Sequence, residues 1–190
     1  LEAGQDFDEP VKWSYAVGKL VSKLEETLEG EKAVQLHEWL SSPAMYEFSS
    51  PSVFTTHATV LGRALSNTDY DLQAAVKEGK VDDELASDHG VKSKHQLEKA
   101  AARNSTIFTT VSKTTGKEAE AVLGEKPDKI LPNGFNVEEY PSLEELSYNH
   151  TKKKSDLKKF LRAYFEPYYD VNLEEDPRIL FISGRYEFHN

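Results

Sequence analysis

The stretch Phe54-Thr55-Thr56-His57-Ala58-Thr59 and the later stretch Phe108-Thr109-Thr110-Val111-Ser112 begin with the same three residues. Each follows a short apolar segment and precedes a helix-like stretch, a pattern typical of a strand-to-helix turn in an α/β sheet. Polar residues just past the ends of parallel strands line the ligand crevice of such sheets. Two further polar turns, 131–136 and 184–187, follow apolar residues in the same way. The sequence therefore predicts a site along one edge of a sheet.

The composition limits the classes of partner. The chain has 190 residues, of which 38% are apolar and 29% charged, with a formal net charge of −10 and no Cys. An acidic chain is repelled by nucleic acid and by anionic membrane surfaces, so we expect neither as a partner. No apolar run approaches the ~20 residues that span a bilayer. The absence of Cys fits a reducing compartment, and we expect a cytoplasmic protein.

Hydrophobic periodicity predicts strands that alternate with helices, which favours a parallel, doubly wound sheet. The predicted strands are 33–36, 53–56, 107–110, 129–131 and 178–183. The predicted helices are 9–28, 43–48, 59–65, 91–103, 113–123 and 142–165, with short solvated helices in 66–90.

Two histidines lie at predicted strand ends. His57 could hydrogen-bond a sugar hydroxyl, or it could be a buried histidine that bonds a backbone carbonyl. His37 and Glu38 have the same two interpretations: they could line a ligand cleft, or they could have a purely structural role. A zinc motif of the H-E-x-x-H type would need a second His at position 41, which is Ser41, so we expect no metal site.

Arg185 follows the last predicted strand and begins a polar turn. Arginine suits bidentate contact with phosphate, although a surface ion pair with Glu187 explains the same position. Asn133-Gly134 fits a tight turn, and most turns of this kind have no role beyond reversing the chain. No hydrolytic triad spacing, G-x-G-x-x-G or Walker loop is present.

Taken together, several short motifs resemble the eukaryotic type of the glycogen synthase family, glycosyltransferase family 3. The resemblance covers about residues 6–190 and rests on these words in order: His37-Glu38-Trp39-Leu40, Phe54-Thr55-Thr56-His57-Ala58-Thr59-Val60-Leu61-Gly62-Arg63, Glu98-Lys99-Ala100-Ala101, Phe108-Thr109-Thr110-Val111-Ser112, Pro132-Asn133-Gly134-Phe135-Asn136-Val137 and Ser183-Gly184-Arg185-Tyr186-Glu187-Phe188.

The resemblance implies a two-domain glycosyltransferase-B fold built of Rossmann-like parallel sheets. Residues 1–137 would form the later part of the N-terminal domain, 138–177 a mainly helical connector, and 178–190 the first strand and turn of the C-terminal domain. The implied reaction is retaining transfer of glucose from UDP-glucose to the non-reducing 4-hydroxyl of an α-1,4-glucan, without a metal or another cofactor.

The resemblance also implies roles for single residues. His57 is expected beside the donor glucose as the catalytic histidine, and Arg63 near the donor in the same cleft. Arg185 is expected to hold the donor diphosphate, and Asn133 to lie in a donor-side cleft loop.

The family's glycine-rich loop and the remainder of its C-terminal domain do not occur within these residues. We therefore expect a fragment that is inactive alone, and leave open whether the parent is a homo-oligomer. Two alternatives remain: a non-catalytic sugar- or protein-binding module, and another retaining glycosyltransferase with a different sugar donor.

Overall fold

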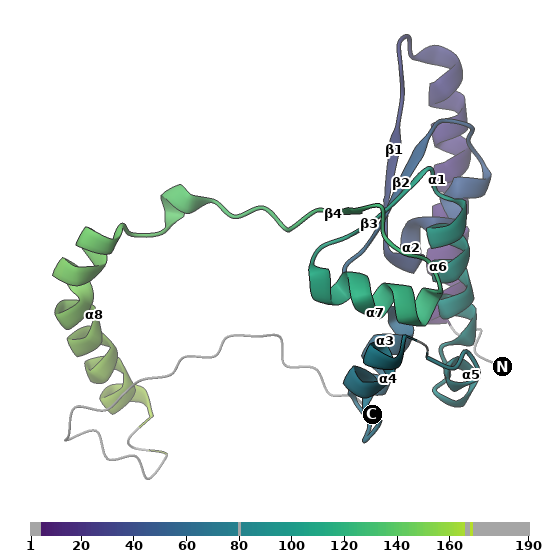
Figure 1. Cartoon of the computed structure of the whole chain (residues 1–190). Helices are drawn as coiled ribbons and strands as arrows, with labels where there is room; N and C mark the ends of the chain where they lie inside the picture. Colours follow the sequence, from purple (N-terminus) through teal and green to yellow (C-terminus); the bar gives the residue numbers. More distant parts are fainter. Residues whose placement is uncertain (1–4, 80, 166–167, 169–190) are drawn as a thin grey trace. The chain divides into compact units, whose positions relative to one another are not determined.

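The computed structural model describes residues 5–79, 81–165 and 168 (Figure 1). The chain divides into two compact units, Leu1–Gly134 and Phe135–Asn190, which are described separately. The predicted strand at 178–183, and Arg185 after it, lie outside the described residues. The predicted domain boundaries stay a prediction.

The first unit is built on a parallel sheet. Its described strands are β1 (Val34–His37), β2 (Ser52–Thr56), β3 (Ile107–Thr110) and β4 (Lys129–Ile130), in the order β1-β2-β3-β4. The register pairs His37 with Thr55, Thr56 with Thr110, and Thr110 with Ile130. The carboxyl ends of these strands therefore meet at one edge, as the sequence predicts.

The parallel sheet and its α/β class are confirmed. The order of the described strands runs in one direction without a reversal. A doubly wound sheet has a point at which the strand order reverses. Double winding therefore stays a prediction.

Helices precede and connect the described strands of the first unit. They are α1 (Gln5–Thr27), α2 (Glu38–Ser41), the 3-10 turn η1 (Ser42–Tyr46), α3 (Val60–Ser66), α4 (Leu72–Glu78), α5 (Leu85–Asp88), α6 (Lys92–Asn104) and α7 (Lys113–Leu123). The predicted short helix at 43–48 is a 3-10 turn instead, and α2 was not predicted. Pro43 removes a backbone donor at the start of η1, which disfavours a continuous α-helix from 38 onwards.

The core lies around the two central strands. Phe54 of β2 and Phe108 of β3 are buried and stack with their ring centroids 5.8 Å apart. The strands are buried on both faces, so their threonines are buried as well. Thr55 and Thr109 satisfy each other through a hydroxyl–hydroxyl hydrogen bond of 2.8 Å. The Thr55 and Thr109 hydroxyl groups are therefore both hydrogen-bonded although they are buried near the ends of the central strands.

Side-chain caps fix where the helices after β2 and β3 begin. The Thr59 hydroxyl accepts the Gly62 N–H at the start of α3, and the Ser112 hydroxyl accepts the Thr115 N–H at the start of α7. Gly124 ends α7 in the left-handed conformation, with φ of 74°, which glycine adopts without a steric penalty. The strand-to-helix turns are therefore locally determined.

The described part of the second unit is mainly helical. It contains the 3-10 turn η2 (Val137–Glu139) and α8 (Leu143–Tyr164), which agrees with the predicted helix at 142–165. Ser142 and Glu145 form a reciprocal capping box at the start of α8. No described residue of α8 is buried.

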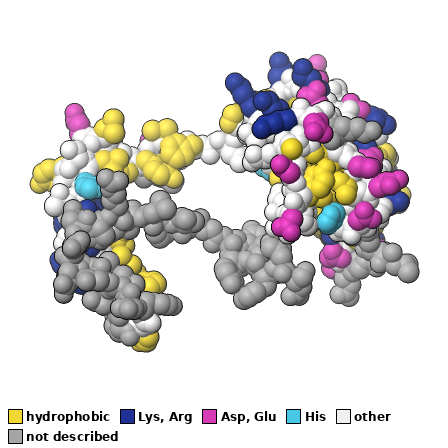
Figure 2. All heavy atoms as spheres, turned by 60° about the horizontal axis from the view of Figure 1, so that its bottom comes forward, with side chains coloured by type: hydrophobic (Ala, Val, Ile, Leu, Met, Phe, Trp, Pro, Cys, Tyr) yellow, Lys and Arg dark blue, Asp and Glu magenta, His cyan; other side chains and the backbone are white. Residues whose placement is uncertain are grey.

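The surface of the first unit carries charge of both signs. On the face drawn at the right of Figure 2, Lys and Arg side chains gather along one side, while acidic side chains surround an apolar patch. On this face, side chains of opposite charge therefore gather in different places. Among the described residues, no helix is both long and apolar enough to cross a membrane.

Candidate functional site

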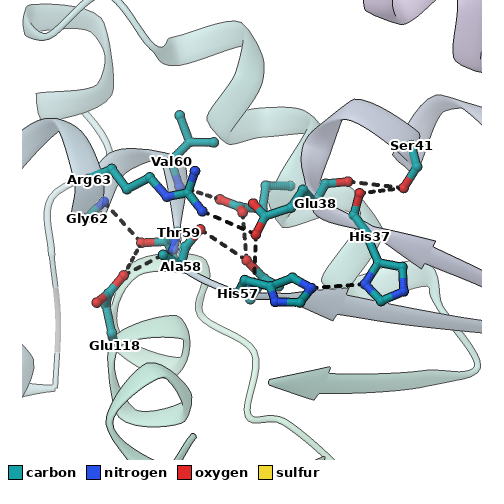
Figure 3. Close-up of polar contacts among 12 residues, drawn as sticks. His37, Glu38, Ser41, His57, Ala58, Thr59, Val60, Gly62, Arg63 and Glu118 are labelled. Atoms are coloured by element: carbon teal, nitrogen blue, oxygen red, sulfur yellow. Dashed lines mark hydrogen bonds and ion pairs between the residues drawn. The ribbon is translucent and has the colours of Figure 1, made fainter. Parts of the chain in front are cut away.

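The carboxyl edge of the sheet brings together four residues that the sequence singles out. β1 ends at His37 and leads into Glu38, while β2 leads into His57 and then into α3, which carries Arg63 (Figure 3). Asn133 is exposed and follows β4, two strands away from β2. Arg185 lies outside the described residues, so its position relative to this edge stays a prediction.

The two histidines contact each other. His37 Nδ1 lies 3.0 Å from His57 Nε2, and the ring centroids are 5.3 Å apart (Figure 3). One of these nitrogens must donate and the other must accept, so at least one ring is neutral in this pair. The contact leaves two ring nitrogens unused, His57 Nδ1 and His37 Nε2, and either could bind a ligand.

Glu38 holds the backbone of His57. It has a φ of 61°, in the left-handed region that a non-glycine residue seldom adopts. Its Oε1 accepts the His57 N–H at 2.9 Å and lies 3.4 Å from Arg63 Nη2. The strained backbone at Glu38 therefore coincides with a side chain that braces the histidine.

Arg63 keeps most of its guanidinium in solvent. Its side chain is 60% exposed, against 16% for Glu38, and a single N–H of the five is directed at the carboxylate. Exposed ion pairs of this kind contribute at most about 1 kcal/mol to stability. Arg63 is thus placed at the site with donors that an anionic ligand could use.

A buried carboxyl group that the sequence analysis did not single out as a site lies directly beneath the edge. Glu98 of α6 is fully buried, and its two oxygens accept the Thr56 hydroxyl and the Val60 N–H, each at 2.9 Å. Burial raises the pKa of Glu98 to about 8, and the negative charge of Glu38 adds to this. The hydrogen bonds from Val60 and Thr56 act in the opposite direction, as does the charge of Arg63. At neutral pH the group therefore holds its proton.

A sequence signal for Glu98 exists. The residues three and four positions later, Ala101 and Ala102, are both buried, so Glu98 falls on the inward face of its helix. A charged residue at an apolar position of a helical pattern is unusual unless it is paired.

Glu118 of α7 holds the same turn from another side. Its Oε1 accepts the Thr59 N–H at 3.1 Å and the Thr59 hydroxyl at 2.6 Å. Gly62 lies against this contact, because an added Cβ would come within 2.5 Å of Thr59 Oγ1 and closer still to Glu118. The glycine permits the close approach of α3 and α7.

The described residues contain no group of three or more His, Cys, Asp or Glu side chains placed to hold a metal ion.

A family model described as glycogen synthase matches residues 4–190. The chain belongs to the glycogen synthase family. It is 34% identical over 189 residues to a glycogen [starch] synthase of Dictyostelium discoideum, covering 96% of this chain and 21% of that protein. It is 39% identical over 160 residues to glycogen [starch] synthase isoform 1 of Saccharomyces cerevisiae, covering 81% of this chain and 22% of that protein.

The liver glycogen [starch] synthase of Mus musculus is 35% identical over 161 residues, covering 82% of this chain and 23% of the mouse protein. The resemblance that the motifs indicate is therefore confirmed. The chain spans 21–24% of the length of the curated glycogen synthases that it matches.

Proposed function

We propose that the chain is part of a glycogen synthase that transfers glucose from UDP-glucose to the non-reducing 4-hydroxyl of an α-1,4-glucan, with retention at the anomeric carbon. The observation that carries the proposal is the family match over residues 4–190. The polar carboxyl edge of the parallel sheet supports it, because α/β folds bind their ligands at that edge.

In this reaction the bond between the anomeric carbon and the UDP oxygen breaks, and a bond to the acceptor 4-oxygen forms. The acceptor hydroxyl loses its proton, and UDP leaves with an additional negative charge. The protein assists by positioning the two substrates and by stabilising the departing diphosphate. The proposal includes no metal and no other cofactor.

We assign His57 to the donor glucose, since its Nδ1 can exchange a hydrogen bond with a sugar hydroxyl. Arg63 and Arg185 are assigned to the donor diphosphate and Asn133 to the donor side of the cleft. His37 and Glu38 are assigned to holding His57, which follows from their contacts with its ring and its backbone N–H. A cytoplasmic location and the absence of nucleic acid and membrane partners belong to the same proposal, which leaves the oligomeric state of the parent open.

The test uses the protein encoded by the complete reading frame, incubated with UDP-glucose and glycogen while UDP release is measured. His57→Ala is expected to lower kcat far more than it lowers the denaturant midpoint. The matched control is His150→Ala, because that histidine is exposed on α8. A large loss of stability with unchanged kcat per folded molecule would show that His57 is a structural histidine.

Arg185→Ala is expected to lower kcat/KM by more than about tenfold, because a charged partner of a phosphate is lost. Arg185→Lys should recover only part, since the bidentate geometry is lost. Near-normal kinetics in Arg185→Ala would remove this residue from the site.

The same assay separates the alternatives. Binding of α-glucan without release of UDP would favour a non-catalytic module. Turnover with another nucleotide sugar and none with UDP-glucose would favour a different donor.

A further inference from the structure

The turn that carries His57, residues 56–60, is held by carboxyl groups from three different helices. Each of these groups accepts a backbone N–H of the turn: Glu38 of α2 that of His57, Glu118 of α7 that of Thr59, and Glu98 of α6 that of Val60. We call this segment the His57 turn. Its backbone donors are therefore bound by side chains distant in sequence.

Glu98 differs from the other two carboxyl groups in its burial. Glu38 and Glu118 are partly exposed, whereas Glu98 is fully buried. It also bonds both ends of the turn, through the Thr56 hydroxyl and the Val60 N–H. Burying a carboxyl group is unfavourable, and an apolar side chain could fill the same space. What an apolar side chain could not supply is the pair of hydrogen bonds.

We propose that Glu98 is a positioning residue for the proposed transferase reaction: its buried carboxyl group fixes both ends of the His57 turn and so sets the direction in which the imidazole faces the bound donor sugar. This inference rests on the proposed function. Glu98 reaches the reaction only through the turn, because its two oxygens are occupied by Thr56 and Val60.

The hydrogen bonds are complete when Glu98 is a neutral acid. The ionised carboxylate accepts the Thr56 hydroxyl, whereas the O–H of the neutral acid donates to the same Thr56 Oγ1, 2.9 Å away. In the neutral form the Thr56 hydroxyl then donates to the Ala58 carbonyl oxygen at 3.3 Å. The other carboxyl oxygen accepts the Val60 N–H. A glutamine has the same shape and the same sequence of donor and acceptor. Glu98→Gln should therefore keep the turn in place, and Glu98→Ala should release it.

A matched control contacts the helix that carries Glu98, from outside that helix. Asp83 is hydrogen-bonded to His95 and Lys99 of α6, away from the His57 turn. Asp83→Asn loosens the attachment of the helix that carries Glu98 without touching the turn. A merely structural role of Glu98 would make Glu98→Ala behave like this control.

The experiment compares Glu98→Gln, Glu98→Ala and Asp83→Asn in the protein encoded by the complete reading frame. It measures kcat with UDP-glucose and glycogen per folded molecule, and amide hydrogen exchange of the peptide that spans the His57 turn. Glu98→Ala is expected to lower kcat by more than about tenfold and to speed exchange of the turn amides, because small misplacements of a positioned group are costly. Glu98→Gln should stay within about threefold of the parent in both, and Asp83→Asn should change neither.

Unchanged kcat and unchanged exchange in Glu98→Ala would overturn the proposal, as would a Glu98→Gln variant as impaired as the alanine. If Glu98→Ala does not fold, Thr56→Val takes its place, because valine removes one of the two hydrogen bonds of Glu98 and keeps the side-chain volume. Thr56→Val should lower kcat about threefold or more. Parent-like kinetics in Thr56→Val would overturn the proposal. If the parent releases no UDP, the proposed function fails. The exchange comparison still decides whether Glu98 orders the turn.

Discussion

Replacing Glu98 by Gln should change how the stability of the chain depends on pH. Burial raises the pKa of the folded-state carboxyl to about 8 from 4.5 in the unfolded chain. Between these values the folded chain holds one more proton than the unfolded chain. Rising pH therefore favours unfolding, and the stability contributed by the neutral acid is present in full below pH 4.5 and is lost as the pH rises through 8. Glutamine does not titrate, so the variant should lack this loss.

The size of the effect follows from the two pKa values. One pH unit inside the window corresponds to about 1.4 kcal/mol. Integrated from pH 5 to pH 8, the parent should lose about 3 kcal/mol of unfolding free energy relative to Glu98→Gln. The charged groups that face Glu98 are Glu38 and Arg63, and both are present in the two proteins.

The assay is urea unfolding of the parent and of Glu98→Gln at pH 5, 6, 7 and 8, followed by far-UV circular dichroism. The difference between the two unfolding free energies should grow with pH in favour of the glutamine variant. Two parallel stability curves would refute the reasoning, because they would mean that Glu98 ionises in the folded chain as it does in the unfolded one.

Three further perturbations have defined outcomes. Gly62→Ala should destabilise the chain by about 1–3 kcal/mol, since the new Cβ collides with the Glu118 contact, whereas Gly134→Ala, which meets open space, should change the denaturant midpoint little. Ser14→Ala should cost about 1–3 kcal/mol of unfolding free energy, because this buried hydroxyl accepts a backbone N–H of η1 at 3.1 Å; an unchanged midpoint would mean that another group takes its place. Addition of EDTA should leave the rate of UDP release from the full protein unchanged, and loss of activity that Mg²⁺ restores would overturn the proposed metal-free reaction.

The secondary structure is largely readable from the sequence because its signals are local. The strand predicted at 53–56 is found at Ser52–Thr56, and the strand predicted at 107–110 is Ile107–Thr110. Apolar periodicity, threonine and serine caps and Gly124 are sufficient to locate these elements and the helices after them.

The contacts of the site are not readable in the same way. His37 and His57 lie 20 residues apart, and they meet because of the register between β1 and β2, which depends on the pairing of the whole sheet. Glu118 looks like an ordinary helix charge, and the pattern around Glu98 marks it as inward-facing without naming its partners. Their role depends on which helix packs beside the His57 turn, and only the tertiary structure determines that.

The strand order also bears on how the first unit is made by the ribosome. Each described strand after β1 pairs with the strand that precedes it in the chain. During synthesis, each newly emerged strand can therefore join the open edge left by its predecessor. No described strand has to insert between two that are already paired, so the nascent sheet can grow vectorially while the rest of the chain is still being translated.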